Sequence, residues 1–258
     1  MEDSMIKSRS LTILNWLIIP FALLTFPVTS TAIDATVSAE FNSAYVYHGI
    51  TYNDGPVVQP SLDLTKGFFG FNLWANYDIS DYNGTLNSHQ FSEIDMTPYI
   101  FTTYNGTELS LSLAEYSYPN VSTEDGGALA GNREIIAAAK HSIYGPLSAE
   151  VRVQYEIKEV KDYYSRLTMF YVLPEVTSNL TVNIAASVAY VGDDTAILSS
   201  GGTEGGFHEY NVKGLVTYTV NKTVKIGANI GYTDSMDKNV LPYTDVNLYG
   251  GLSIQKSL

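Results

Sequence analysis

The segment 147–158 alternates apolar and polar residues without interruption. Successive side chains of a β-strand point to opposite faces, so this period of two predicts a strand with one apolar and one charged face. The same alternation recurs along most of the chain and predicts an all-β protein. About twelve strands are expected, over residues 36–49, 57–65, 69–79, 93–104, 108–116, 133–142, 147–158, 163–173, 180–191, 208–220, 224–233 and 244–254.

The links between the predicted strands alternate in length. Tight turns are expected at Lys66-Gly67, Asn105-Gly106, Gly145-Pro146 and Asn221-Lys222, and Asn-Gly is the strongest short hairpin signal. Long polar links are expected over residues 80–92, 119–132, 192–207 and 234–243, whereas the link near Glu159 is short. Short periplasmic turns and longer outer loops are typical of an antiparallel transmembrane β-barrel, which we therefore predict.

Alternation alone does not say which face of the strands points inward. A soluble β-sandwich or a lipocalin-like barrel would bury the apolar face instead. A barrel of about eight strands has room for side chains or one ligand, whereas twelve strands around an apolar interior would leave a void. An apolar face turned toward lipid removes that difficulty. A sandwich stays an alternative, although its edge strands would need protection.

The N-terminus has the order of a secretory signal peptide. Lys7 and Arg9 precede an apolar stretch over residues 11–28, and the small residues Ser30-Thr31-Ala32 follow. We expect cleavage after Ala32, which makes residues 1–32 the signal peptide and residues 33–258 a single outer-membrane barrel domain. The alternative, an uncleaved membrane anchor, is less favoured because two prolines interrupt the apolar stretch.

The charge balance restricts the partners. Against 14 Lys and Arg stand 27 Asp and Glu, a net charge of −13, and this argues against nucleic acid as a partner because its phosphates would be repelled. The 20 tyrosines suit the boundary between lipid and water. We therefore expect contact with outer-membrane lipid and lipopolysaccharide, and with small polar solutes or ions. No oligomeric state follows from the sequence.

The polar faces of the predicted strands carry charges, which need a wet lumen or partners among the interior side chains. Acids outnumber bases on these faces, so a weak preference for cations is the working hypothesis. The candidate lumen-lining residues are Glu40, Asp63, Asp78, Glu93, Asp95, Glu150, Arg152, Glu156, Arg166, Glu209, Lys213 and Lys225.

No catalytic residue, metal site or cofactor is predicted. The four histidines, His48, His89, His141 and His208, lack the spacing of metal ligands on one strand face. His208 and Glu209 are neighbours in a predicted strand and should point to opposite faces, where they could not act together. A hydrolase assembled at the barrel rim from different strands is nevertheless kept as a third possibility.

Three consecutive segments resemble the beginning of the TorF-type porins. They are Ser43-Ala44-Tyr45-Val46-Tyr47-His48-Gly49-Ile50, the run 54–63 with Asp54, Pro56, Gln59 and Asp63, and the aromatic run 67–76 with Gly67, Phe71, Trp74 and Asn76. The chain departs from the family pattern at His48, where an arginine is usual, and at its C-terminus, which lacks a terminal aromatic residue. The resemblance implies a bacterial outer-membrane barrel with a porin-like function.

Together these features predict an outer-membrane protein of a Gram-negative bacterium, without enzyme activity, through which small polar solutes or ions diffuse passively. The rival interpretation is a structural or scaffolding barrel whose lumen is closed by pairs between Arg152 and neighbouring acids. The rim hydrolase is the third.

Overall fold

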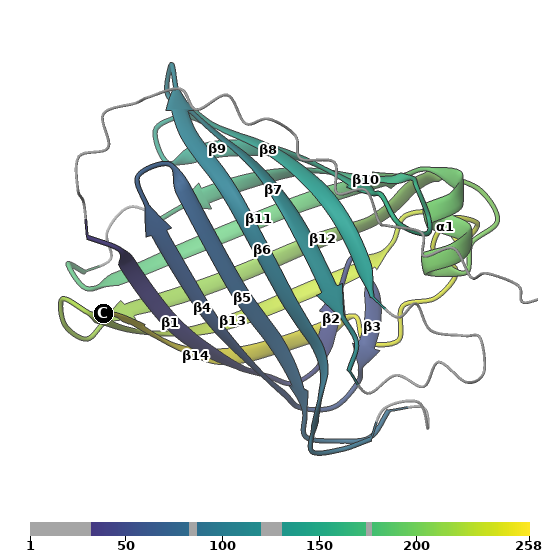
Figure 1. Ribbon diagram of the computed structural model, residues 1–258, viewed down its shortest axis with the longest axis horizontal. Coiled ribbons are helices and arrows are strands. Elements are labelled where there is room, and N and C mark those ends of the chain that lie inside the picture. Colours follow the sequence, from purple (N-terminus) through teal and green to yellow (C-terminus); the bar gives the residue numbers. More distant parts are fainter. Residues whose placement is uncertain (1–31, 83–86, 120–130, 174–176) are drawn as a thin grey trace, which may run out of the picture. The chain divides into compact units, whose positions relative to one another are not determined.

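The computed structural model describes residues 32–82, 87–119, 131–173 and 177–258. Within these residues twelve antiparallel strands close into one barrel (Figure 1). In order around the barrel they are β1 (Asp34–Asn42), β14 (Leu248–Ser257), β13 (Val224–Ser235), β12 (Gly206–Thr219), β11 (Leu180–Val191), β10 (Tyr163–Val172), β9 (Leu147–Glu156), β8 (Asn132–Tyr144), β7 (Thr107–Ser117), β6 (Gln90–Tyr104), β5 (Phe69–Asp78) and β4 (Val57–Lys66), which pairs with β1. The predicted all-β, twelve-stranded barrel is confirmed, whereas the predicted signal peptide falls almost entirely outside the described residues.

The apolar faces of the strands form the outside of the barrel. Many large aliphatic side chains at strand centres are exposed there: Leu73, Met96, Leu111, Leu113, Ile135, Val151, Val153, Leu167, Ile184, Val212, Val216, Ile226, Ile230, Leu252 and Ile254. An apolar exterior of this extent is unsuited to water and fits lipid. The soluble alternatives, which needed the apolar face inside, are therefore wrong. In the described part of the chain no helix has both the length and the hydropathy to cross a membrane.

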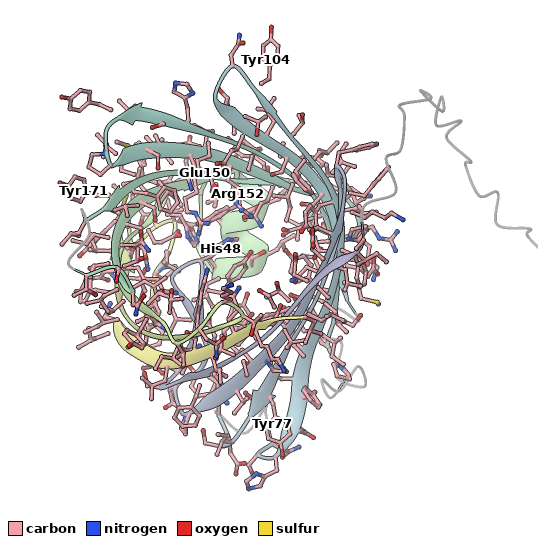
Figure 2. All side chains as sticks on the ribbon, turned by 90° about the vertical axis from the view of Figure 1, so that its left-hand side faces the viewer. His48, Tyr77, Tyr104, Glu150, Arg152 and Tyr171 are labelled. Atoms are coloured by element: carbon pink, nitrogen blue, oxygen red, sulfur yellow. The ribbon has the colours of Figure 1, made fainter. Side chains whose placement is uncertain are left out.

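Aromatic side chains gather on the outside near both ends of the barrel. One end carries Tyr77, Phe91, Tyr163, Tyr190, Phe207 and Tyr232, and the other carries Phe69, Phe101, Tyr104, Tyr144, Tyr171 and Tyr218. Figure 2 shows Tyr77 and Tyr171 on the outer side of the ring. Neighbours touch within the first group, with ring centroids 5.2 Å apart for Tyr77 and Phe91 and 5.5 Å apart for Tyr190 and Phe207. Two such girdles mark the interfacial regions of a lipid-embedded barrel.

The two ends of the barrel differ in their connections. The long links predicted over residues 80–92 and 119–132 lie partly outside the described residues. At the turn end, β6 and β7 are joined by Asn105 (φ 48°) and Gly106 (φ 74°), and two positive φ angles are what a tight I′ hairpin turn requires. The predicted turn at Asn105-Gly106 is confirmed. The loop end instead carries a short hairpin, β2 (Tyr45–Tyr47) with β3 (Ile50–Asn53), and the helix α1 (Asp193–Ser200) (Figure 1).

The prediction of one strand over residues 36–49 is wrong, because β1 ends at Asn42. The chain then forms the β2–β3 hairpin, whose turn residues His48 and Gly49 have φ angles of 52° and 73°. The alternation continues through this turn and hides it, and His-Gly is a weaker turn signal than Asn-Gly. Likewise the link expected over residues 192–207 as a loop contains α1, and the last strand begins at Leu248 rather than at residue 244.

A glycine in β5 makes room for an aromatic ring inside the barrel. Gly70 and Tyr99 are register partners, and a Cβ added at Gly70 would lie 2.0 Å from Cζ of the Tyr99 ring. The same tyrosine hydroxyl donates to both carboxylate oxygens of Asp63, at 3.1 and 3.0 Å. We expect Gly70→Ala to displace this ring and to destabilise the barrel by about 1–3 kcal/mol. Urea unfolding in detergent measures this. The control is Gly214→Ala, where the added Cβ would meet only Cγ2 of Ile230, at an ordinary contact distance of 3.6 Å. Equal effects of the two substitutions would contradict the packing argument.

Candidate functional site

The β2–β3 hairpin lies inside the barrel lumen rather than above it. Figure 2 looks along the barrel and shows His48, the tip of the hairpin, within the ring of strands together with Glu150 and Arg152. Asn42, the last residue of β1, and Val57, the first of β4, are register partners, so the fourteen residues between them form an excursion from an otherwise continuous sheet. The hairpin therefore narrows the lumen at its loop end.

One side of the hairpin is held by hydrogen bonds to the wall. The Tyr45 hydroxyl donates to Oε2 of Glu93 at 2.8 Å, and Nδ2 of Asn53 donates to Oδ1 of Asp78 at 2.7 Å. All four side chains are buried, and Asn53 and Asp78 have no exposed area. Buried polar groups that find partners fix a single arrangement, because moving them would leave charges or donors unsatisfied.

The tip of the hairpin is held by stacked rings. The His48 imidazole stacks on Tyr164 with centroids 3.6 Å apart and 9° between the planes, and on Tyr47 at 3.7 Å. His48 lies outside the twelve barrel strands. Burial, assisted by the positive charge of Arg166, holds the pKa of its imidazole well below its usual range. The ring is therefore neutral at neutral pH, and its face can lie on the tyrosine without a buried charge.

A hydrogen-bonded chain continues from Tyr164 to helix α1. The Tyr164 hydroxyl donates to Oε1 of Glu209 at 2.5 Å, Oε2 of Glu209 lies 2.6 Å from Nδ1 of His208, and Nε2 of His208 lies 2.6 Å from Oγ of Ser200. Because an ionised carboxylate only accepts, Nδ1 is the donor toward Glu209, and in a neutral imidazole Nε2 then accepts from the Ser200 hydroxyl. The chain links β10, β12 and α1 behind the hairpin tip.

The prediction that His208 and Glu209 point to opposite faces is wrong. Both side chains are buried, with 1% and 3% exposure, and they bond each other. The register between β11 and β12 shifts here, since Val188 pairs with Tyr210 but Tyr190 pairs with Phe207. Such a bulge inserts an extra residue and re-aims a side chain, so the strict alternation fails at this position.

Two polar cavities lie inside the lumen next to the hairpin. The larger has a volume of about 560 Å³ and is bordered by Glu40, Asn42, Gln59, Asn72, Trp74, Asp95, Thr97, Arg152, Lys213 and Asn229, among others. The second has a volume of about 300 Å³ and is bordered by Arg166, Thr168, Ser187, Glu209, Asn211, Lys213 and Tyr249, among others. Val46, Tyr47, Lys213 and Tyr249 border both. A third cavity of about 80 Å³ lies at the loop end and is bordered by His48, Tyr52, Ser200 and His208, among others.

The predicted lumen residues occupy several distinct environments. Glu40, Asp95 and Arg152 border the larger cavity, Arg166 and Glu209 the second, and Lys213 both. Asp63 lies toward the turn end, bonded to Tyr99, and Glu150 lies 3.4 Å from Nε of Arg152. Asp78 and Glu93 anchor the hairpin, as described above. Lys225 lies exposed at the beginning of β13 and borders neither of the two larger cavities.

Glu156 has a local structural role in the short link between β9 and β10. It is 5% exposed, and its carboxylate accepts the backbone N–H groups of Lys158, Glu159 and Lys161 at 2.6, 2.8 and 3.0 Å, as well as that of Val160. These bonds explain how so short a link closes at the loop end. Reversing the charge at Glu156 would therefore disturb the link as well as any ion path.

The most important residues that the sequence does not reveal are those of the hairpin and those of the barrel wall that contact it. The alternating pattern places Tyr45 and Tyr47 in a barrel strand and indicates no role for Gln154. In the structure Nε2 of Gln154 donates to the Tyr47 hydroxyl at 3.2 Å and to Glu134 at 2.9 Å. Glu134 could have been found, because it has the inward parity of its strand. The hydrogen bonds of the hairpin described above join residues 25, 48 and 107 positions apart in the chain, and no local sequence pattern reports them.

No family model matches the sequence, and no curated protein sequence matches it either. Solved structures with a similar fold include the KdgM porin, with a TM-score of 0.55 and 10% identity over 86% of this chain and 99% of that one. The NanC porin has a TM-score of 0.50 and 9% identity over 87% of this chain and 98% of that one. The COG4313 outer membrane channel from Pseudomonas putida F1 has a TM-score of 0.50 and 9% identity over 88% of this chain and 94% of that one. At such low identity the similarity shows the fold, a barrel of the kind that these porins and this channel have.

Proposed function

We propose that this protein is a channel of the outer membrane of a Gram-negative bacterium, through which small polar solutes or ions diffuse passively. The turn end then faces the periplasm, and the loop end, with the hairpin and α1, faces the exterior. The porin-like fold and the resemblance of residues 43–76 to TorF-type porins support this proposal.

The observation that carries the proposal is the polar space left beside the hairpin. The cavity of about 560 Å³ is far larger than the roughly 30 Å³ that one water occupies in the liquid. A scaffold barrel closed by side chains would fill this space. Among the residues that the structure describes, Arg152 forms an ion pair with Glu150 alone, through one long contact of 3.4 Å, so the ionic closure that the scaffold interpretation requires is sparse at this position.

Single-channel recording of the purified, folded protein in a planar bilayer tests the proposal. We expect discrete and reproducible current steps, because ions can follow a wet lumen past the hairpin. A protein that migrates as a folded barrel on a gel but gives no steps would contradict the channel and favour the closed scaffold.

The chain Ser200–His208–Glu209 favours a second candidate function, the rim hydrolase. A hydroxyl, an imidazole and a carboxylate in this order, 2.6 Å apart at each contact, have the arrangement of a nucleophile with its base and orienting acid. Ser200 and His208 also border the small cavity at the loop end. However, Ser200 is the last residue of α1, where the helix dipole disfavours the negative charge that the reaction would develop. We therefore place this candidate second.

A fluorophosphonate probe decides between a catalytic and a structural Ser200. A catalytic serine attacks phosphorus, fluoride leaves, and His208 takes the hydroxyl proton. Labelling that disappears in Ser200→Ala and in His208→Gln, but persists in Ser199→Ala, would support the hydrolase. Absence of labelling in a folded barrel would leave the chain as a structural link between α1 and the wall.

A further inference from the structure

The basic side chains that border the two larger cavities lie on one part of the barrel wall. The predicted lumen acids on the same strands, Glu150, Glu156 and Glu209, are each bonded to neighbouring groups. On the neighbouring strands β1, β4, β5 and β6 the predicted lumen residues are all acids, and two of these, Asp78 and Glu93, bond the hairpin. The bases Arg152, Arg166 and Lys213 lie on β9, β10 and β12, on another part of the wall. We call these three residues the basic arc. The excess of acids among all predicted lumen residues therefore does not describe the electrostatic field near these bases.

The basic arc places like charges next to each other. Arg152 and Arg166 are register partners on β9 and β10 and point to the same face. Side chains in this relation have Cβ atoms about 4.5–5.5 Å apart, and like charges placed so repel each other. Within the part of the chain that the structure describes, Arg152 pairs with the carboxylate of Glu150, and Arg166 has no such partner. The repulsion is relieved when an anion lies between the two guanidinium groups.

The rest of the arc lacks acidic partners. Among the described residues no ion pair includes Arg166 or Lys213, and the Nε atom of Arg166 is buried without a hydrogen-bond partner. Glu209 borders the same cavity, but its two oxygens are engaged with Tyr164 and His208. A donor removed from water without an acceptor costs free energy, which a ligand that supplies an acceptor would recover.

The cavity of about 300 Å³ provides space and further donors for such a ligand. It brings Arg166 and Lys213 together with hydroxyl groups of Thr168, Ser187 and Tyr249. The Tyr249 oxygen accepts from Asn211 at 2.9 Å, which leaves its own proton free to donate. Positively charged donors beside several hydroxyl groups suit a solute that carries a carboxylate and several hydroxyls. Arginine recognises carboxylates with two parallel bonds.

We propose that the basic arc binds carboxylate-bearing polar solutes, such as small sugar acids, and makes them preferred passengers of the channel. The inference rests on the proposed function and replaces the expectation of a weak cation preference. Arg166 and Lys213 would hold the carboxylate in the smaller cavity. Arg152 and Lys213 would receive it in the larger one, so that Lys213 serves both positions.

Titration calorimetry with glucuronate and with glucose tests the binding and needs no open pore. We expect the folded barrel to bind glucuronate and to bind glucose at least about tenfold more weakly, because a charged acceptor is lost. Arg166→Gln and Lys213→Gln should each weaken glucuronate binding about tenfold or more. Lys222→Gln, in a turn outside the cavities, removes the same charge and should have no effect. Equal binding of the two sugars, or no loss in the two variants, would overturn the proposal.

Bilayer recording separates this inference from the proposed function. We expect glucuronate to interrupt the current through the wild-type channel, and Arg166→Gln to shift the reversal potential toward cations. Binding without any current would uphold the basic arc and refute the channel, whereas current without binding would uphold the channel and refute the arc. Because Arg166→Gln could disturb folding, Arg166→Lys, which keeps the charge but loses the two-pronged contact, provides a second variant. It should keep the reversal potential and weaken glucuronate binding.

Discussion

Removal of the β2–β3 hairpin should raise the single-channel conductance severalfold. The register pairing of Asn42 with Val57 allows residues 43–56 to be replaced by an Asn-Gly turn that joins β1 directly to β4. The strands of the barrel then stay as they are, while the segment that narrows the lumen is gone. Asp78 and Glu93 would lose their bonds to the hairpin but would become hydrated in the wider lumen, so we expect the variant to fold.

The matched control is Asp54→Asn, a substitution of an exposed side chain within the same segment, which leaves the hairpin and its contacts with the wall in place. Its conductance should stay close to that of the wild type. If the hairpin deletion left the conductance unchanged, the constriction would have to lie elsewhere. If deletion opened a silent wild-type barrel, the hairpin would be a plug, and passage would require its movement.

Replacement of Glu209 by alanine should give the largest loss of stability among single substitutions at the loop end. The carboxylate accepts from Tyr164 at 2.5 Å and bonds His208 at 2.6 Å, and all three side chains are at most 5% exposed. Alanine would leave a hydroxyl and an imidazole buried without their acceptor. We expect a decrease of about 2–5 kcal/mol in the free energy of unfolding, since each buried unsatisfied group costs about 1–3 kcal/mol. Urea unfolding in detergent, followed by tryptophan fluorescence, measures it.

Two further variants make this result specific. Glu209→Gln keeps the size and one acceptor oxygen and should lose less than Glu209→Ala. Glu159→Ala removes an exposed carboxylate at the same end of the barrel and should change the stability by no more than about 0.5 kcal/mol. A small loss in Glu209→Ala, similar to that of Glu159→Ala, would mean that water replaces the missing acceptor and that the network does not stabilise the loop end.

The outward and inward faces of the barrel could be read from the sequence because they depend on local alternation. In the strand that contains Val151 and Val153, each apolar residue is followed by a polar one, and the pleat of any strand converts this order into two faces. The turn at Asn105-Gly106 could also be predicted, because its signal lies in two adjacent residues. Closure of twelve strands followed from the number of such segments and from the alternation of short and long links.

The hairpin in the lumen could not be read from the sequence, because its location depends on partners far away in the chain. Tyr45 meets Glu93, Tyr47 meets Gln154 and His48 meets Tyr164, and all of these residues fit a barrel strand equally well by their pattern. The bulge that turns His208 and Glu209 to the same side is a further departure, set by the pairing of β12 with β11. The register is fixed by the pairing of two strands, so the sequence of one strand alone does not predict it.

The sequence by itself thus determined the class of fold, the apolar exterior and the set of charges available to the interior, because a two-residue period assigns every side chain to a face. Only the tertiary structure decided which of those charged side chains bond the hairpin and the loop links, and which border the cavities. The reason is that a charge on the inner face acts according to its neighbours across the lumen. Glu156 and Arg166 both fit the same alternating pattern. Backbone N–H groups surround the Glu156 carboxylate, whereas Arg166 borders a cavity and pairs with no acid in the described ranges.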